Sequence, residues 1–274
     1  MKVEIKDLSY VYPSQDCALR GVSLVMEGTT PVAIVGQNGA GKTTLVKHLN
    51  GLLRPTSGQV LIDGVDINTH TTAQWSRKVG YVFQNPDDQL FLESVRKEFE
   101  FGPKHMGMRK EEIGERVEYV SNLVGLADQL DTHPFDLTST QKRFCTIGII
   151  MMMNPDLILF DEPTCGQDAQ GIRRLRKIIQ ELRNQGKLCI TISHDMRFVA
   201  ENFKRIIVMK KGEAILDDDI EKVFARTETL KQCFITPPPI TRVAQGADLK
   251  KTPFTGKAFM EAFEEERERR ICQM

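Results

Sequence analysis

Apolar and polar residues alternate in several segments of the N-terminal part of the chain, and this pattern predicts β-strands. The segments KVEIKDL (2–8) and VSLVME (22–27) alternate and contain β-branched residues, which favours strands. GQVLIDGVDI (58–67) has the same character on both sides of Asp63-Gly64, a dipeptide typical of a tight hairpin turn. We therefore expect an antiparallel β-subdomain in addition to the main core.

Short continuous apolar runs predict buried strands that are separated by helices. The runs are PVAIVG (31–36), KVGYVFQ (78–84), LILFDE (157–162) and KLCITISH (187–194). Helical patterns cover 42–50, 92–124, 139–153 and 168–184, the second of them interrupted at Gly102-Pro103 and again at Gly107. RIIVMKKGEAILDD (205–218) is typical of a closing hairpin. This alternation predicts an α/β fold with a parallel sheet at its core and a helical insertion at about 92–153.

A shift in composition near the C-terminus divides the chain in two. The three prolines of ITPPPITRV (235–243) end the preceding element and indicate a linker. FMEAFEEERERR (259–270) then predicts a charged helix with the i,i+4 pairs Glu265/Arg269 and Glu266/Arg270. We expect a domain over 1–234 and a C-terminal extension over 235–274.

Composition limits the classes of function. Lys plus Arg equals Asp plus Glu at 37 each, so the net charge gives no reason to expect a nucleic-acid partner. The N-terminus does not have the pattern of a signal peptide, and the most apolar run, 147–153, is far shorter than the ~18 residues of a membrane span. The 6 cysteines form no C-x-x-C pair, which favours reduced thiols in a cytosolic protein over a disulfide or metal role.

A glycine-rich loop between the strand 31–36 and the helix 42–50 fits the pattern G-x-x-x-x-G-K-[ST]. Glycines let backbone N–H groups close around phosphate oxygens, and the helix N-terminus adds its positive end. Lys42 can reach the β- and γ-phosphates, and the Thr43 hydroxyl can bind Mg²⁺. A purely structural turn is the weaker interpretation, because strand, loop and helix are in register. The candidate nucleotide-binding residues are Gly36, Gln37, Asn38, Gly39, Ala40, Gly41, Lys42, Thr43 and Thr44.

Acidic and imidazole side chains end two of the predicted buried strands. Asp161 suits a Mg²⁺ ligand, and Glu162 would face the γ-phosphate, where it can orient or deprotonate an attacking water. Many strands end in acids, so the pair alone is a weak indication of a catalytic site. Together with the phosphate loop it is a strong one. His194 could donate to the γ-phosphate, or it could be an ordinary structural residue. The other histidines (48, 70, 105 and 133) lack such a context and are interpreted as structural or surface residues.

The segments GQNGAGKTT, VFQ, LILFDEPT, GQD (166–168) and SHD, in this order and spacing, resemble the ATP-binding cassette (ABC) ATPases over about residues 1–225. The resemblance implies that Tyr12 stacks on adenine and that Asp168 communicates across an ATPase dimer. It also implies that Gln84 touches Mg²⁺ and the attacking water and links the site to a transmembrane partner. Alternatively, Tyr12 is an ordinary strand aromatic and Gln84 a polar residue at a strand end.

The segment VGYVFQNPDDQLFLESVRKEFEFGP is similar to that of the energy-coupling-factor and cobalt-type import ATPases, which energise uptake of vitamins and transition-metal ions. The tail resembles their C-terminal extension, which helps two ATPases to dimerise. This resemblance implies ATP and Mg²⁺ as cofactors and a peripheral position on the cytoplasmic face of the cell membrane. The implied partners are a second ABC ATPase, a transmembrane coupling subunit and a substrate-binding membrane subunit. Asp87, Asp88 and Glu93 could present negative charge to a coupling helix near Gln84, or could lie in a solvated loop.

One motif departs from the family. Where the family has Leu-Ser-Gly-Gly-Gln, closing over ATP held by the other subunit, the residues are Leu137, Thr138, Ser139, Thr140 and Gln141. Thr138 and Gln141 fit a capping box, so the helix start and its dipole should persist. Ser139 and Thr140 instead place Cβ atoms where backbone must approach phosphate, at a larger cost if either position needs a positive φ. Phe144 also stands where the family usually has Arg.

These observations predict an ATPase that works in an asymmetric heterodimer. The site built on this chain's phosphate loop, with Glu162 and His194, is expected to hydrolyse ATP, whereas the partner's ATP is hydrolysed slowly or not at all. An ATP-gated regulatory subunit with weak catalysis is the alternative. A soluble ABC protein acting on nucleic acid or ribosomes is disfavoured by the zero net charge and by the segment QNPDDQLF. The transported substrate is not encoded in this chain.

Overall fold

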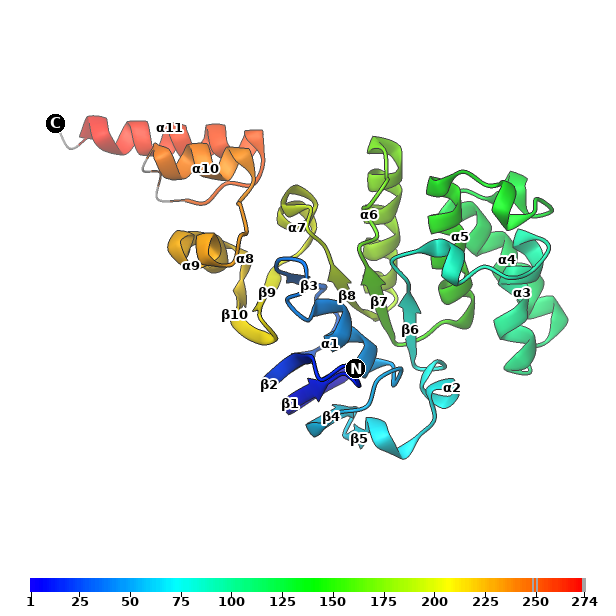
Figure 1. The fold of residues 1–274 in the computed structure, drawn as a ribbon. Coiled ribbons are helices and arrows are strands. Elements are labelled where there is room, and N and C mark those ends of the chain that lie inside the picture. Colours follow the sequence, from blue (N-terminus) through cyan, green and yellow to red (C-terminus); the bar gives the residue numbers. More distant parts are fainter. Residues whose placement is uncertain (248, 250, 273–274) are drawn as a thin grey trace.

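A six-stranded sheet with the strand order β10-β9-β3-β8-β7-β6 lies at the centre of the molecule (Figure 1). The computed structural model describes residues 1–247, 249 and 251–272, with side chains to residue 269. All strand pairs of this sheet are parallel except β9 with β10, which confirms the predicted parallel core and closing hairpin. The strands are β3 (Val32–Val35), β6 (Val79–Val82), β7 (Leu157–Asp161), β8 (Leu188–Ile192), β9 (Arg205–Lys210) and β10 (Glu213–Asp219).

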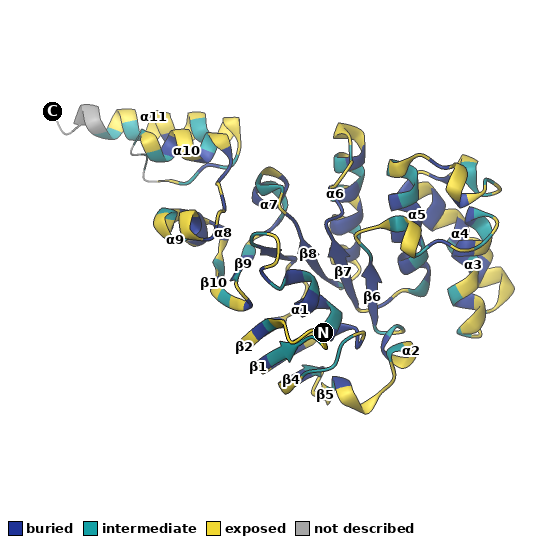
Figure 2. Ribbon diagram, in the orientation of Figure 1, coloured by how far each residue is buried: buried dark blue, intermediate teal, exposed yellow. Residues whose placement is uncertain are grey.

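Both faces of the central sheet are covered. In β3, Ala33 and Val35 belong to one hydrophobic cluster and Val32 and Ile34 to the other, as expected when successive side chains point to opposite faces. The helices that follow its strands include α1 (Lys42–Leu49), α6 (Ala169–Asn184) and α7 (Met196–Asn202). Figure 2 shows the buried residues gathered in the sheet and on the helix faces turned toward it.

An antiparallel sheet of four strands, ordered β2-β1-β4-β5, forms the predicted β-subdomain. Its strands are β1 (Lys2–Val11), β2 (Cys17–Glu27), β4 (Ser57–Ile62) and β5 (Val65–Asp66), so β1 and β2 are longer than expected. Asp63 and Gly64 have φ of 49° and 79°, as a type I′ hairpin turn requires. The 3₁₀ helix η1 (Ile67–Thr69) and helix α2 (Thr72–Trp75) lead back to the core.

The helical insertion contains η2 (Pro86–Asp88), α3 (Val95–His105), α4 (Lys110–Val124), η3 (Ala127–Gln129), η4 (Pro134–Asp136) and α5 (Ser139–Met153). The bounds of α5 agree with the prediction. The predicted interruption at Gly102-Pro103 is wrong, because α3 continues through it, and the chain leaves the helix near Gly107 instead. The residue before Pro103 is glycine, which lacks the Cβ that normally clashes with a proline ring in a helix.

The C-terminal region contains α8 (Ile220–Ala225), α9 (Thr227–Gln232), α10 (Pro239–Gly246) and α11 (Gly256–Cys272). The predicted linker over 235–243 is partly wrong, because α10 begins inside it. Pro239 occupies a first-turn position, where the missing N–H of proline costs nothing. Buried Thr241 donates from Oγ1 to the Pro253 carbonyl at 2.8 Å, and this bond holds α10 against the segment before α11.

Of the two ion pairs predicted for the last helix, Glu265/Arg269 does not form, and Glu266/Arg270 involves a side chain outside the described residues. Glu265 pairs with Lys251 rather than with Arg269, and Arg269 pairs with Glu266 at i,i+3. The side chain of Arg270 lies outside the described residues. Within the described ranges, no helix combines the length and apolar character needed to span a membrane.

Candidate functional site

The phosphate loop connects β3 to α1 and depends on glycine at both of its ends. Gly36 and Gly41 have φ of 153° and 96°. A Cβ on Gly36 would lie 2.3 Å from the Met209 carbonyl oxygen, and one on Gly41 would lie 2.6 Å from that of Ala18. Only glycine therefore fits these positions, for reasons of both space and backbone conformation.

Lys42 folds back over this loop. Its Nζ donates to the carbonyl oxygens of Gly36 at 2.8 Å and Gln37 at 3.0 Å. Burial lowers the pKa of Lys42, and the nearby carboxylates of Glu162 and Asp161 act in the opposite direction. The lysine is thus held at the phosphate loop, next to the acid pair.

A pocket of about 310 Å³ brings the predicted site segments together. Gln84, which follows β6, lies in its wall with the acid pair at the end of β7. The parallel strands place these residues at one edge of the sheet, as the sequence predicts. The other lining residues are Asn38, Gly39, Ala40, Gly41, Lys42, Thr43, Thr44 and Ile192.

Asp161 is 1% exposed and has one unsatisfied oxygen. Its Oδ2 accepts from the Tyr81 hydroxyl at 2.8 Å, whereas buried Oδ1 has no partner among the described residues. A buried carboxylate oxygen without a partner is costly, and with the oxygens of Thr43 and Gln84 it forms the hard donor set that Mg²⁺ prefers. The residues present therefore fit this ion.

Tyr81 is a site residue that the sequence prediction missed. Burial, reinforced by Asp161, raises the pKa of the Tyr81 hydroxyl far above its usual value, so it remains a hydrogen-bond donor to the carboxylate. The sequence signal for this role is the position of Tyr81 in the strand before Gln84. That signal leads to Asp161 only when β6 and β7 are known to be neighbours.

Glu162 and His194 contact each other directly. His194 Nδ1 lies 2.7 Å from Glu162 Oε2, and the His194 backbone N–H donates to the same oxygen at 3.2 Å. Glu162 is 7% exposed and has a positive φ of 49°, a conformation that costs a non-glycine residue about 1 kcal/mol or more. The strained turn directs the carboxylate to the end of β8, and this contact between the two predicted residues was not itself predicted.

Tyr12 lies at the edge of the phosphate loop. Its hydroxyl is 3.0 Å from Thr44 Oγ1, and its ring packs edge-on against Tyr10 with a centroid distance of 4.9 Å. Tyr12 follows the last residue of β1. The stacking of this ring on adenine stays a prediction.

The altered motif at 137–141 starts α5 with an intact cap. The Gln141 N–H donates to Thr138 Oγ1 at 3.3 Å, and the Thr138 N–H donates to Gln141 Oε1 at 2.9 Å, which confirms the predicted capping box. Ser139 and Thr140 are the first helical residues and neither has a positive φ. The larger cost that a positive φ would bring does not arise.

The motif and Asp168 lie away from the pocket on this chain's own phosphate loop. Neither Asp168 nor any residue of 137–141 lines that pocket. Asp168 caps α6, since its Oδ1 accepts from the Gly171 N–H at 2.7 Å, and the Thr140 hydroxyl lies 3.5 Å from the Gly166 carbonyl oxygen. The motif therefore faces the segment that precedes α6, and its predicted role at a dimer interface stays a prediction.

Two residues that follow the motif were not predicted as functional. Arg143, 5% exposed, donates from Nη1 to the Phe83 carbonyl at 2.8 Å, and Lys142 pairs with Asp87 at 3.0 Å. Both contacts join the start of α5 to the segment that carries Gln84. Burial lowers the pKa of Arg143, so its hydrogen bond and the nearby acids are needed to keep the charge in place.

The acids near Gln84 have partners inside the chain. Asp87 pairs with Lys142, Asp88 accepts from Asn85 at 3.0 Å, and Glu93 pairs with Lys97. Lysines therefore balance the charges of Asp87 and Glu93, whereas the partner of Asp88 is a neutral amide.

The phosphate loop, the acid pair and the histidine lie at the ends of parallel strands, and the core carries an antiparallel sheet and a helical insertion. Together these features define a P-loop ATPase of the ATP-binding cassette type. Comparison with known proteins agrees. Residues 19–165 match the family model described as ABC transporter. The chain is 38% identical to the energy-coupling factor transporter ATP-binding protein EcfA2 of Clostridium perfringens over 250 residues, covering 88% of both chains.

The chain is also 37% identical to EcfA of Methanothermobacter thermautotrophicus over 238 residues, covering 86% of this chain and 76% of that one. The structure of cbiO1 from Clostridium perfringens, described as part of the ABC transporter complex cbiONQ, matches with a TM-score of 0.76 and 30% identity. That match covers 89% of this chain and 98% of the other. Longer relatives also match, and this chain spans 42% of one of them. The chain belongs to the ABC transporter family and is an ATP-hydrolysing cassette of the energy-coupling-factor type of importer.

Proposed function

We propose that this chain is one of two different ATPase subunits of an importer for a vitamin or a transition-metal ion. It would act at the cytoplasmic face of the membrane with a transmembrane coupling subunit and a substrate-binding membrane subunit. The names of its relatives, energy-coupling factor transporter ATP-binding protein and a part of the complex cbiONQ, support this assembly.

The contact between Glu162 and His194 at 2.7 Å carries the catalytic part of the proposal. Glu162 is the proposed general base for the water that attacks the γ-phosphate. His194 uses Nδ1 for Glu162, so Nε2 is the ring atom left for a phosphate oxygen. Lys42, now bonded to two loop carbonyls, can transfer its donors to the phosphates.

The Mg²⁺ of the nucleotide would be held by Thr43, Gln84 and Asp161. The ion, when bound, supplies charge that neutralises the phosphates. Unsatisfied Asp161 Oδ1 supports the assignment. Tyr81 fixes the other oxygen of this carboxylate, so only one oxygen is free to turn toward the ion.

Asymmetry follows from Ser139 and Thr140 in place of two glycines. Their side chains stand on the first turn of α5, where backbone N–H groups would approach ATP on the partner subunit. The obstruction comes from side-chain bulk rather than from backbone strain, because neither residue has a positive φ. The altered motif of this chain thus covers the ATP on the partner's phosphate loop poorly. The ATP on this chain's own phosphate loop would be covered by an unaltered Leu-Ser-Gly-Gly-Gln motif of the partner.

The test restores the family motif in the assembled importer with the substitutions T138S, S139G and T140G. If one site is nearly silent, steady-state ATP turnover should rise by about twofold, since a second site starts to contribute. The matched control Thr140→Ser keeps the Cβ atom and should change little. Unchanged turnover in the restored variant contradicts the asymmetry, and so does a homodimer of the native chain that hydrolyses ATP at both sites.

A regulatory subunit with weak catalysis is the second candidate, favoured by the same substituted glycines. Single-turnover hydrolysis in the heterodimer separates the two. Rapid release of phosphate from the ATP bound at this chain's phosphate loop supports a catalytic subunit. ATP that stays bound there without being hydrolysed supports a regulatory subunit.

Docking of the membrane partner is proposed beside Gln84. Phe91 and Phe101 are 63% and 40% exposed, and their rings pack edge-on at 5.1 Å. Exposed aromatic pairs are typical anchors in protein interfaces. Because Asp87 and Glu93 are paired with lysines of the chain, apolar contacts rather than charge would supply most of the affinity.

A further inference from the structure

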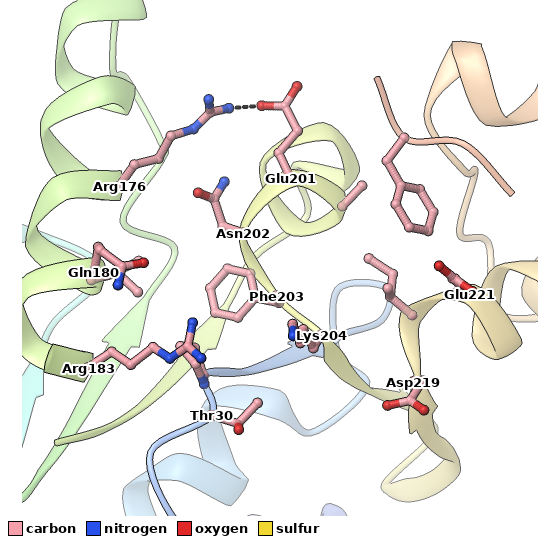
Figure 3. A pocket seen from close by; sticks show the side chains of 15 residues that line it. Thr30, Arg176, Gln180, Arg183, Glu201, Asn202, Phe203, Lys204, Asp219 and Glu221 are labelled. Carbon is pink, nitrogen blue, oxygen red and sulfur yellow. Dashed lines mark ion pairs between the residues drawn. The ribbon is translucent and has the colours of Figure 1, made fainter. Parts of the chain in front are cut away.

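A cavity of about 630 Å³ lies between α6, α7, the start of α8 and the segment before α11, away from the ATP site (Figure 3). We call it the α6–α8 cavity. It shares no lining residue with the phosphate-loop pocket. Its volume is in the range of pockets that hold small organic ligands, and the established ATPase activity gives it no role.

The floor of the α6–α8 cavity is apolar. Ile179, Phe203 and Ile220 line it from three different elements and are each less than 8% exposed. Phe254 adds a ring from the C-terminal extension and packs on Phe224 with a centroid distance of 5.8 Å. A ligand with an apolar body would cover this surface.

The α6 side of the cavity is basic. Figure 3 shows Arg176 and Arg183 reaching from α6 toward the cavity, with Lys204 beside Arg183. Arg176 pairs with Glu201, and its buried Nε has no hydrogen-bond partner. Within the described part of the chain, the side chains of Arg183 and Lys204 form no ion pair or hydrogen bond.

The acids that line the cavity differ in how far nearby cations balance their charge. Glu201 is shared by Arg176 and Arg197. Lys222 lies 3.8 Å from Asp219 but pairs more closely with Asp218, at 2.8 Å. Glu221, on the opposite side in Figure 3, is the remaining acid without an ion pair among the described residues. The lining as a whole carries three cations and three carboxylates. Arg183 and Lys204 lie apart from Asp219 and Glu221 in Figure 3, so the surplus of positive charge is local to the side near α6.

We propose that the α6–α8 cavity binds an organic anion with an apolar body, either a carboxylate or a phosphate monoester. The anionic group contacts Arg183 and Lys204, and the body lies on Phe203 and Phe254. The walls of the cavity belong to helices that start next to Asp168 and His194 and to the C-terminal extension. A ligand there contacts the catalytic core and the extension together.

The test uses three probes with the same aromatic body: 1-naphthoate, 1-naphthyl phosphate and neutral 1-naphthylmethanol. Binding to the full chain is measured by calorimetry with saturating Mg²⁺-ADP, which keeps the phosphate loop occupied. At least one anion should bind about tenfold or more tightly than the neutral probe, as expected for charge-assisted hydrogen bonds. A tighter phosphate identifies a phosphate monoester as the ligand class, and a tighter naphthoate identifies a carboxylate.

Variants locate the binding. The double substitution R183Q/K204Q should weaken the tighter anion by about tenfold or more, and Phe254→Ala should weaken all three probes. Glu221→Gln should strengthen the anions, because it removes an opposing charge. The matched control Arg173→Gln alters an exposed arginine of the same helix outside the cavity and should leave binding unchanged.

The proposal is overturned if no anion binds at millimolar concentration, if the neutral probe binds as tightly as the anions, or if R183Q/K204Q binds like the native chain. Circular dichroism of each variant identifies any that fail to fold. For such a variant, the single substitutions R183Q and K204Q replace the double one, each with an expected loss of about threefold or more.

Discussion

Glu162 has an unusual backbone conformation for a residue with a side chain, and this conformation decides what its carboxylate can reach. With a φ of 49°, it leaves β7 and turns toward the end of β8, 2.7 Å from His194. Strain of this kind persists only where the surroundings impose it and is concentrated at functional sites. The sequence pattern identifies the residue, but its strain and its contact with His194 come from the fold.

Glu162→Gln should leave ATP binding intact and reduce hydrolysis roughly 100- to 10,000-fold, because a positioned general base contributes about that much. Amide and carboxylate have the same shape, so the turn should survive. Fluorescent-nucleotide binding and single-turnover hydrolysis measure the two effects. Retained turnover would remove Glu162 from the role of general base.

His48 predicts a dependence of stability on pH. It is fully buried, its Nδ1 lies 2.8 Å from the Thr44 carbonyl oxygen, and Nε2 has no partner in the described part of the chain. Burial lowers the pKa of His48 below 6.5, so the unfolded chain takes up the proton at a higher pH than the folded chain. The contribution of neutral His48 to the free energy of unfolding is complete above about pH 6.5. It is lost as the pH falls through the pKa of His48 in the folded state.

Urea unfolding at pH 7.5 and pH 5.5 measures this effect. The free energy of unfolding should fall with decreasing pH, by at most about 1.4 kcal/mol per pH unit from this one group. The variant His48→Gln cannot take up the proton and should show a smaller fall. Equal pH dependence in the two proteins would assign the effect to other groups.

At the scale of elements, the connection between the Gln84 segment and α3 depends on one buried acid. Glu98 is 1% exposed, and its Oε1 accepts from the backbone N–H groups of Phe91 at 2.6 Å and Leu92 at 2.7 Å. Burial raises the pKa of Glu98, and the two hydrogen bonds oppose this shift. The exposed ring of Phe91 thus stands on a loop whose backbone is held by the buried Glu98 carboxylate.

Glu98→Ala removes both acceptors and leaves two backbone N–H groups without partners, so it should lower the free energy of unfolding by about 2–3 kcal/mol. Glu98→Gln keeps one oxygen in place and should cost less. Urea unfolding measures stability, and amide hydrogen exchange reports on Phe91 and Leu92 individually. Unchanged exchange of these amides in Glu98→Ala would contradict the role of Glu98.

Element boundaries followed from the sequence where local signals decided them. The capping box at Thr138 and Gln141 gave the start of α5, and Asp63-Gly64 gave the hairpin turn. The error at Gly102-Pro103 arose because two helix-breaking residues lie within α3, whose Phe99 is fully buried against the insertion core. Tertiary packing of the helix outweighed the local preference.

At the scale of the whole molecule, the C-terminal extension is attached to the core through few contacts. Gln245 donates to the Phe224 carbonyl at 2.8 Å, and Phe254 packs on the Phe224 ring. Figure 1 shows α10 and α11 projecting from the core at the end opposite the helical insertion. Most of the described side chains of α11 are exposed, which suits the dimerisation role expected for the extension.

Truncation after Phe234 should leave a folded, ATP-binding core and weaken association with the partner ATPase by about tenfold, or ~1.4 kcal/mol. Analytical ultracentrifugation of mixed subunits measures the association, and thermal unfolding checks the core. The control Lys251→Ala breaks only an exposed ion pair with Glu265 and should have little effect. Association unaffected by truncation would assign dimerisation to the core alone.

The sequence by itself determined the phosphate loop, the buried strands and the cap of α5, because these depend on residues a few positions apart. Only the tertiary structure decided the contacts of Tyr81 with Asp161, Arg143 with Phe83 and His194 with Glu162, whose partners are separated by 80, 60 and 32 positions. It also decided that α10 forms from a proline-rich segment and that the α6–α8 cavity exists. The physical reason is the same in each case: such contacts depend on which strands are neighbours and which helices pack together, and no local pattern specifies that.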